Sequence, residues 1–211
     1  MSLNDPISPA ISAVILGGAL LAALSIVYQS WRNGISPMPS PAVVRRAAVR
    51  ELRRLLRAGA SGPTNDILRP LAAPQQPGTI VEAGAGWGSL ALDLARSFPQ
   101  QRIVGLENSI IPWFFSCLAA RLSAVQNVQL RRGDIYEYSY EAAAVVVCYL
   151  YPGAMKRLDP ILRARLEPGT WVVSICFALP GWQAVHEMTC NDLYRTKIYF
   201  YRIEPDEKGG I

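Results

Sequence analysis

Three glycines and an acid stand together in the stretch TIVEAGAGWGSLALDLA. Gly84, Gly86 and Gly88 occupy alternate positions after a short apolar run that carries Glu82 near its end. Glycine is needed where the backbone adopts a positive φ or where a ligand approaches without a Cβ in the way. A dinucleotide-binding turn, GxGxxG, would need its third glycine at the position of Ser89, so a pyrophosphate site fits poorly. The acid would repel a phosphate, and it suits a cationic ligand.

Two further acids follow later apolar runs. Glu107 ends the run RIVGLE, and Asp134 follows NVQLRRG. A carboxylate at the end of a second strand can accept hydrogen bonds from both hydroxyls of a ribose. An acid after the third strand can meet the amino group of an adenine. Together with Glu82, these residues predict a site for S-adenosylmethionine, whose sulfonium and α-ammonium groups are cationic.

Short apolar runs alternate with helical patterns over the second half of the chain. We expect strands at residues 79–83, 102–107, 127–134, 142–150, 170–179 and 197–203, and helices at 89–98, 110–124 and 154–166. Strands that are apolar throughout, with helices between them, predict an α/β fold with a doubly wound parallel sheet covered on both faces. In such sheets ligands bind beyond the carboxyl ends of the strands. The glycines and the acids fall at these ends.

This constellation resembles the class I, seven-stranded S-adenosylmethionine-dependent methyltransferases, which have a Rossmann-like doubly wound sheet. Within that class, the order of several segments is similar to a family of protein lysine methyltransferases. The family includes archaeal broad-specificity enzymes and membrane-anchored mitochondrial enzymes that modify the c subunit of ATP synthase. The likeness covers about residues 36–203, in the segments PMPSPAVVRRA, VEAGAGWG, GLENS, VVVCYLYPGAM, LEPGTWVVS and FALPGW.

The resemblance implies roles for individual residues. The implied cofactor-binding residues are Glu82, Ala83, Gly84, Gly86, Gly88, Glu107, Asn108, Asp134 and Ile135. The implied catalytic residues, lining the methyl-transfer channel, are Tyr149, Tyr151 and Pro152. Pro39 and Ser40 are expected to close over the site, Trp182 is a further candidate for the substrate channel, and no metal is expected. The family usually has Asp at the positions of Glu82 and Trp87, and Thr at that of Ser40.

A lysine acceptor must be neutral, which costs about 4 to 5 kcal/mol at pH 7 for an amine with a pKa near 10.4. Desolvation in an aromatic channel lowers that pKa, and ring faces attract the methylated ammonium product. Tyr149, Tyr151 and Trp182 are candidates for this channel, although the two tyrosines could also be core or rim aromatics. His186, the only histidine, is expected to be a satisfied or solvated side chain and not a base.

The segment SIIPWFFSCL is rich in aromatic residues and is expected to be core, with Ile110 or Trp113 as a possible cover for the adenine.

The N-terminal part has a different composition. Residues 7–31 carry no charge and are long enough to span a bilayer, so we expect an uncleaved transmembrane helix, with a signal peptide as the alternative. Arginines downstream predict a catalytic domain that faces the cytoplasm. Residues 41–58 predict a basic amphipathic helix that either adheres to anionic lipid or packs on the domain. The expected organisation is a tail at 1–6, the span at 7–31, the basic helix and linker at 32–78 and the methyltransferase domain at 79–211.

The sequence thus predicts a methyltransferase that acts on a protein lysine, with a membrane protein as one possible substrate. A small lipophilic acceptor, such as a quinone or a lipid precursor, is the alternative, and a non-catalytic membrane scaffold is another. Nucleic acid is not expected as a partner, because the arginines cluster beside the apolar segment. The four cysteines are widely spaced and form no CxxC pair, so neither a disulfide framework nor a zinc site is expected.

Overall fold

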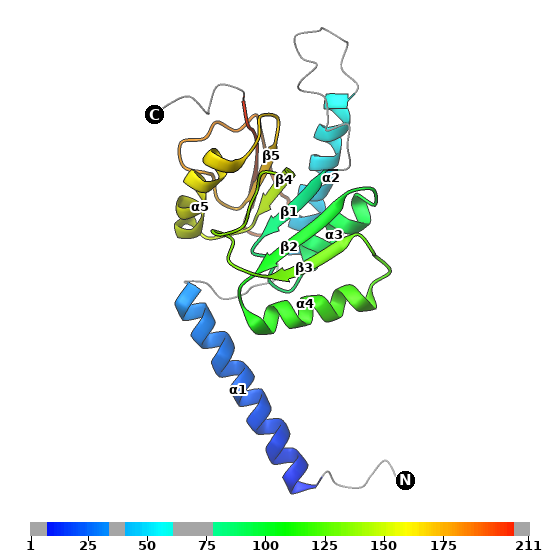
Figure 1. Cartoon of the computed structure of the whole chain (residues 1–211), viewed down its shortest axis with the longest axis vertical. Helices are drawn as coiled ribbons and strands as arrows, with labels where there is room; N and C mark the ends of the chain where they lie inside the picture. The colour runs from blue at the N-terminus through cyan, green and yellow to red at the C-terminus, as the bar shows by residue number, and fades with distance from the viewer. Residues whose placement is uncertain (1–7, 34–40, 61–77, 205–211) are drawn as a thin grey trace. The chain divides into compact units, whose positions relative to one another are not determined.

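The computed structural model describes residues 8–33, 41–60 and 78–204 (Figure 1). The chain divides into two compact units, Met1–Met38 and Pro39–Ile211, which are described separately. The elements in chain order are α1 (Pro9–Asn33), α2 (Ala42–Ala60), β1 (Thr79–Ala83), α3 (Ser89–Ser97), β2 (Arg102–Glu107), α4 (Ile110–Leu122), β3 (Val128–Arg132), β4 (Ala143–Cys148), α5 (Pro152–Arg165), β5 (Trp171–Ile175), β6 (His186–Thr189) and β7 (Lys197–Arg202).

The second unit is built on one seven-stranded sheet with the order β3-β2-β1-β4-β5-β7-β6. The chain runs outward from β1 through β2 to β3, and then returns to place β4 on the other side of β1. The strand order therefore reverses between β1 and β4, and a ligand site is expected beyond the carboxyl ends of these two strands. The predicted seven-stranded α/β fold is confirmed.

The last two strands differ from the predicted parallel arrangement. The five strands β1 to β5 pair in parallel, but β7 runs antiparallel to β5, and β6 runs antiparallel to β7. The connection from Thr189 to Lys197 is a hairpin loop. Parallel pairing would require a crossover of a dozen residues or more, which this loop is too short to provide.

Helices cover both faces of the sheet. On one face, α2 and α3 pack over apolar side chains of the strands. On the other face, α5 packs over Val81, Val104 and Val146 through Met155 and Leu158. Because consecutive strand residues point to opposite faces, strands buried on both sides are apolar at nearly every position.

Helix α2 is part of the domain core. Its apolar face consists of Val44, Ala48, Val49 and Leu52, each at most 6% exposed, and it contacts α3. Of the two alternatives for this basic helix, packing on the domain is therefore confirmed. The compact unit begins at Pro39, so the boundary predicted at residue 79 lies inside it. The opposite face of α2 carries the exposed arginines Arg46, Arg50, Arg53, Arg54 and Arg57.

One ion pair and one carboxylate–histidine contact hold α2 against α3 and the sheet. The Arg45 guanidinium lies 2.8 Å from the Asp93 carboxylate on α3. The Glu51 carboxylate lies 3.0 Å from Nε2 of His186 on the edge strand β6. One contact is to α3 and the other is to the edge strand β6, so α2 extends across this face as far as that edge of the sheet.

The first unit contains α1. Large apolar side chains are exposed along this helix, among them Val14, Leu16, Leu20 and Leu21. In the part of the chain that the structure describes, no helix combines the length and the hydropathy needed to cross a membrane. The transmembrane helix predicted over residues 7–31 is therefore not supported.

The packing of α2 leads to a prediction about stability. Leu52→Ala should lower the free energy of unfolding of the whole domain by about 2 to 5 kcal/mol, because it removes a side chain that is 1% exposed and leaves a cavity. Urea unfolding monitored by circular dichroism measures this change. The control is Leu193→Ala, whose side chain is 89% exposed and which should change stability by less than about 0.5 kcal/mol. An equal effect of the two substitutions would contradict the assignment of α2 to the core.

Candidate functional site

The glycine turn after β1 lies at the point where the strand order reverses. Gly84 and Gly86 have φ values of 80° and 52°, which L side chains rarely adopt. A Cβ on Gly84 would lie 2.7 Å from Cδ2 of Leu150, which follows β4, whereas a Cβ on Gly86 would meet nothing within 4 Å. The turn is therefore closed against β4 at its first glycine and open at its second.

The Glu107 carboxylate connects this turn to the end of β2. One oxygen accepts a hydrogen bond from the Gly86 amide at 2.7 Å, and the other accepts one from the Ser109 amide at 2.7 Å. The Glu107 carbonyl also accepts one from the Gly133 amide at 3.1 Å. Each carboxylate oxygen retains a second acceptor position. Glu107 thus has the capacity to accept the two ribose hydroxyls for which it was predicted, and its neighbour Asn108 is exposed.

Glu82 is a buried carboxylate with an orphaned oxygen. Its side chain is 3% exposed, and Oε2 has no hydrogen-bond partner among the described residues. Burial raises the pKa of Glu82 well above its usual value. The Ala91 amide opposes this shift, the Glu107 charge adds to it, and the Arg45 charge again opposes it. A cationic group brought by a ligand would stabilise the ionised form, so the site fits the sulfonium and ammonium groups of S-adenosylmethionine.

Asp134 lies in the turn after β3. Its Oδ1 accepts a hydrogen bond from the Tyr136 amide at 2.9 Å, and no partner for Oδ2 is recorded among the described contacts. The next residue, Ile135, is half-buried and packs against the apolar cluster that includes Met155 and Leu158 of α5. Ala83 is fully buried in β1, so only its backbone could face a ligand. This arrangement agrees with the predicted adenine contact, which remains a prediction.

Tyr136 is a residue of this edge that the sequence analysis missed. The Arg157 guanidinium stacks 3.8 Å from the centre of its ring. Burial raises the pKa of Tyr136, and the nearby Tyr151 adds to the shift. The first aromatic position in GDIYEYSY, residues 133–140, was the available signal, but nothing in the sequence joined it to residues after β4.

Tyr149 and Tyr151 flank Leu150, the side chain that lies against the glycine turn. Both rings are half-buried. Burial raises the pKa of Tyr149, and Cys176 and Asp192 add to the shift. The Tyr151 ring lies over Gly153, where a Cβ would be 2.6 Å from Cε2 of the ring. Pro152 is exposed and begins α5.

The other predicted site residues lie elsewhere or outside the described residues. The indole N–H of Trp182 donates to the Asp159 carboxylate on α5, and its ring is 5.6 Å from that of Tyr201 on β7. The structure thus groups Trp182 with α5 and β7, and its role in the channel remains a prediction. His186 pairs with Glu51. Pro39 and Ser40 lie outside the described residues, so their expected closure over the site is not described.

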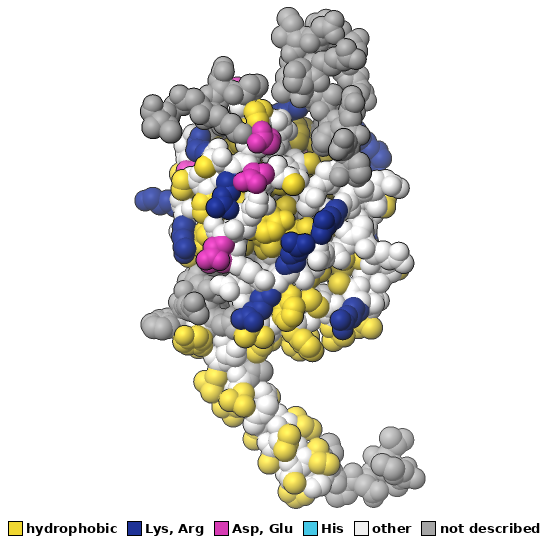
Figure 2. Space-filling model, viewed as in Figure 1, with side chains coloured by type: hydrophobic (Ala, Val, Ile, Leu, Met, Phe, Trp, Pro, Cys, Tyr) yellow, Lys and Arg dark blue, Asp and Glu magenta, His cyan; other side chains and the backbone are white. Residues whose placement is uncertain are grey.

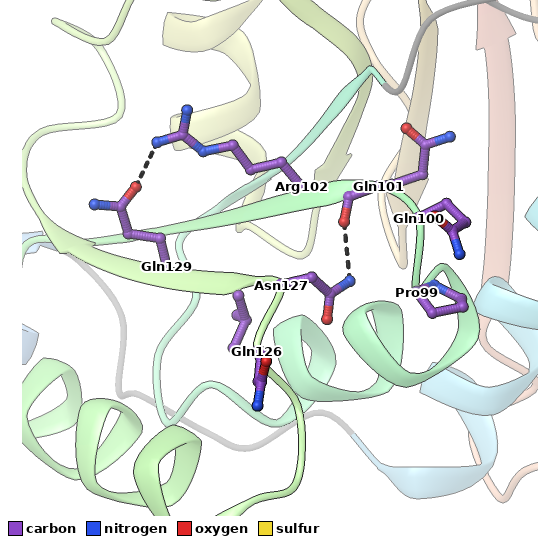
Figure 3. Close-up of a pocket in the computed structure, with 8 residues that line it drawn as sticks. Pro99, Gln100, Gln101, Arg102, Gln126, Asn127 and Gln129 are labelled. Carbon is purple, nitrogen blue, oxygen red and sulfur yellow. Dashed lines mark hydrogen bonds between the residues drawn. The ribbon is translucent and has the colours of Figure 1, made fainter.

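A polar hollow of about 400 Å³ lies at the amino-terminal ends of β2 and β3, opposite the carboxyl edge (Figure 3). Several of its polar groups satisfy one another, whereas the buried Oε1 of Gln101 has no hydrogen-bond partner among the described residues. Arg102 donates to Gln129 at 2.7 Å, and the Asn127 amide donates to the carbonyl oxygens of Ala95, Phe98 and Gln101. These bonds hold the loops together, so the hollow is a structural feature and not the candidate site.

Comparison with known proteins agrees with this geometry. Residues 82–186 match the family described as ANTKMT methyltransferase domain. The protein-lysine N-methyltransferase of Saccharolobus islandicus (strain REY15A) is 27% identical over 129 residues, which cover 58% of this chain and 76% of that protein. The adenine nucleotide translocase lysine N-methyltransferase of Mus musculus is 31% identical over 113 residues, 52% of this chain. The match spans 48% of the mouse protein, about half of its length.

A similar solved structure is that of an RNA methyltransferase from Salinibacter ruber in complex with S-adenosyl-L-homocysteine. It superposes with a TM-score of 0.59 at 25% identity and covers 80% of this chain and 95% of that one. The chain is a class I S-adenosylmethionine-dependent methyltransferase. Its cofactor is S-adenosylmethionine, and the residues predicted to hold it are Glu82, the glycine turn, Glu107 and Asp134.

One prediction for the site concerns Glu107. Glu107→Ala should weaken binding of S-adenosylhomocysteine by about 1 to 3 kcal/mol, because the ribose loses its acceptors and the amides of Gly86 and Ser109 lose theirs. Isothermal titration calorimetry measures the affinity, with circular dichroism as a check on folding. The control Glu187→Ala removes an exposed carboxylate on β6 and should bind like the parent. A folded Glu107→Ala variant with parental affinity would refute the predicted contact.

A second prediction concerns Glu82 and pH. Because the pKa of Glu82 is raised in the folded state, the unfolded state loses its proton first, and the parent loses stability as pH rises from about 4.3 towards the folded pKa. Glu82→Gln should therefore be more stable than the parent at pH 8, by more than about 1 kcal/mol, and equally stable near pH 4. Urea unfolding at the two pH values measures this difference.

The same substitution should weaken S-adenosylmethionine binding more than S-adenosylhomocysteine binding, since only the former carries the sulfonium charge. If the free energy of unfolding of Glu82→Gln equals that of the parent at both pH values, the buried Glu82 carboxylate does not destabilise the folded protein.

Proposed function

We propose that this methyltransferase transfers a methyl group from S-adenosylmethionine to the side-chain amine of a lysine in a protein. Two observations of relatedness support the proposal: the similar proteins are named as lysine N-methyltransferases, and the matching family is described as a methyltransferase domain. These relatives are similar over about half of this chain. The acceptor therefore has to be argued from the site itself.

The observation that carries the proposal is the arrangement of Tyr149, Leu150 and Tyr151. Leu150 packs against Gly84, so the two tyrosines flank the cofactor turn at the place where the strand order reverses. The bound cofactor supplies a methyl group on a sulfonium, a good leaving group. The protein's part is to orient the acceptor and to exclude water. Half-buried aromatic rings on both sides of Leu150 suit that task.

The tyrosines also suit the charge changes of an amine acceptor. Burial raises the pKa values of Tyr136 and Tyr149, so both phenols are neutral at pH 7. Neutral rings desolvate a lysine and lower its pKa, which favours the nucleophilic free amine. Their faces attract the methylated ammonium that forms. The only histidine is paired with Glu51 on α2, so we assign it no part in proton removal.

We further propose that the acceptor is a membrane protein and that α1 brings the enzyme to a lipid bilayer, with the domain on the cytoplasmic side. The exposed apolar side chains along α1 support attachment, and the exposed arginines of α2 suit an anionic surface. Flotation of the full chain with lipid vesicles, with and without the substitutions Leu16→Glu and Leu20→Glu in α1, tests this attachment.

The acceptor class can be tested by methyl transfer from labelled S-adenosylmethionine to a membrane fraction. We expect label that is released by protease and is recovered as methylated lysine after acid hydrolysis. Label that is extracted by organic solvent would support a lipophilic acceptor instead, and label released by ribonuclease an RNA. Absence of transfer by an enzyme that binds the cofactor would favour a scaffold.

The role of Tyr151 can be separated from stability by Gly153→Ala. The new Cβ forces the Tyr151 ring to move, and a misplacement of this size can lower kcat/KM by about 10- to 100-fold. Stability should not fall, because alanine is favoured over glycine in a helix by roughly 0.5 to 1 kcal/mol. The matched control is Gly17→Ala in α1, where a Cβ meets nothing within 4 Å. Full activity of Gly153→Ala would remove Tyr151 from the channel.

A further inference from the structure

Helix α4 exposes large apolar side chains along one line. Ile110, Phe114, Leu118 and Leu122 recur at every fourth residue and are 46%, 58%, 42% and 81% exposed. Phe115, beside this line, is 49% exposed. These five residues are called the α4 face. The aromatic segment 109–118 was predicted to be core, and for Ile110, Phe114, Phe115 and Leu118 that prediction is wrong.

The helix packs on the domain with its smaller residues. Pro112 and Ser116 are the residues of α4 that are buried, and Ser116 lies where a Cβ on Gly88 would be 2.8 Å from its Cβ. The Trp113 indole donates to the Leu130 carbonyl of β3 at 3.3 Å. An ordinary surface helix turns its large apolar residues to the core. Because α4 reverses this pattern, its outer face requires an apolar environment of its own.

The charges in the segment that contains the α4 face have a single sign. Residues 108–133 contain no aspartate or glutamate, and their charged residues are Arg121, Arg131 and Arg132, all exposed. Figure 2 shows hydrophobic side chains gathered over α4, with lysine or arginine side chains beside them. A line of aromatic and aliphatic residues with basic neighbours is typical of helices that lie in the plane of a membrane interface.

We propose that the α4 face inserts into the surface of a lipid bilayer that carries anionic headgroups. The four-residue spacing runs along the helix axis, so the helix would lie flat, with its apolar side chains among the acyl chains and its arginines at the headgroups. A second copy of the chain is a poorer occupant, because two such faces would bring arginines of like charge together. The proposal does not depend on the identity of the methyl acceptor.

The α4 face adjoins the cofactor turn. The ring of Phe115 is 5.9 Å from that of Trp87, which lies between Gly86 and Gly88. A second connection lies at the start of α4, where the Ser109 amide donates a hydrogen bond to the Glu107 carboxylate. Insertion of this face would therefore hold the cofactor turn close to the lipid surface.

The test is flotation of the full chain with vesicles of phosphatidylcholine, with and without phosphatidylglycerol. To remove the contribution of α1, all proteins carry Leu16→Glu and Leu20→Glu, which place charges at exposed positions of that helix. In this background we expect binding to the anionic vesicles. Adding Phe114→Glu and Leu118→Glu should weaken that binding by roughly 10-fold or more. The matched control adds Leu193→Glu and Tyr194→Glu, which are 89% and 81% exposed on the β6–β7 loop, and should bind like the background protein.

Two further measurements keep the outcome interpretable. Unchanged affinity for S-adenosylhomocysteine shows that the Phe114→Glu, Leu118→Glu protein is folded. Arg131→Gln with Arg132→Gln should weaken binding to the vesicles with phosphatidylglycerol and leave binding to phosphatidylcholine unchanged. The proposal is overturned if the background protein does not float, or if the α4 variant floats as well as its control. It is also overturned if the α4 substitutions only dissociate a dimer seen by sedimentation. Comparison with the chain that retains Leu16 and Leu20 measures the attachment by α1 separately.

Discussion

The hydrogen bonds of the Glu107 carboxylate are the interaction on which the site depends. They join the turn after β1 to the short loop between β2 and α4 at one buried point. The turn after β1 is held in addition by the amides of Gly84 and Ala85, which both donate to the Leu106 carbonyl of β2. A carboxylate is suited to this position because it accepts several hydrogen bonds and donates none. The same group can then serve the ribose without rearrangement, which is the meaning of a preorganised site.

Glu107 serves both the fold and the binding of a ligand, whereas Glu82 is unfavourable for the fold and suited to binding a cation. Its buried carboxyl lacks a partner for one oxygen, and the Glu107 charge close by makes ionisation harder. Arg45, from α2, is the compensating charge, but it is also held by Asp93 of α3. Helix α2 therefore takes part in the electrostatics of the site, although it precedes the sheet in the sequence. A cationic ligand would supply the positive charge that the ionised Glu82 carboxylate lacks in the protein alone.

The strands and the glycine turn could be predicted because each has a local signal: continuous apolar runs and glycines at positive φ. The surface that covers the apolar face of α2 could not be predicted. Its periodicity shows an apolar face but not what covers it, so membrane and domain were equal alternatives until Val44 and Leu52 were seen in the core. Tyr136 was missed because its neighbours Tyr151 and Arg157 come from a later part of the chain. Long-range contacts of this kind leave no pattern in a single sequence.

The α4 segment was misread for a related reason. Hydrophobicity measures how strongly a side chain avoids water, and a protein core and a lipid interface satisfy that tendency equally well. What separates the two cases is the pattern of small residues: Pro112 and Ser116 face the sheet, so the large side chains have no room beneath the helix. The adjacent arginines and the absence of acids from residues 108–133 then favour a lipid surface over another protein of the same charge. An enzyme that presents such a face beside its cofactor turn is suited to acceptors that are themselves held at a membrane.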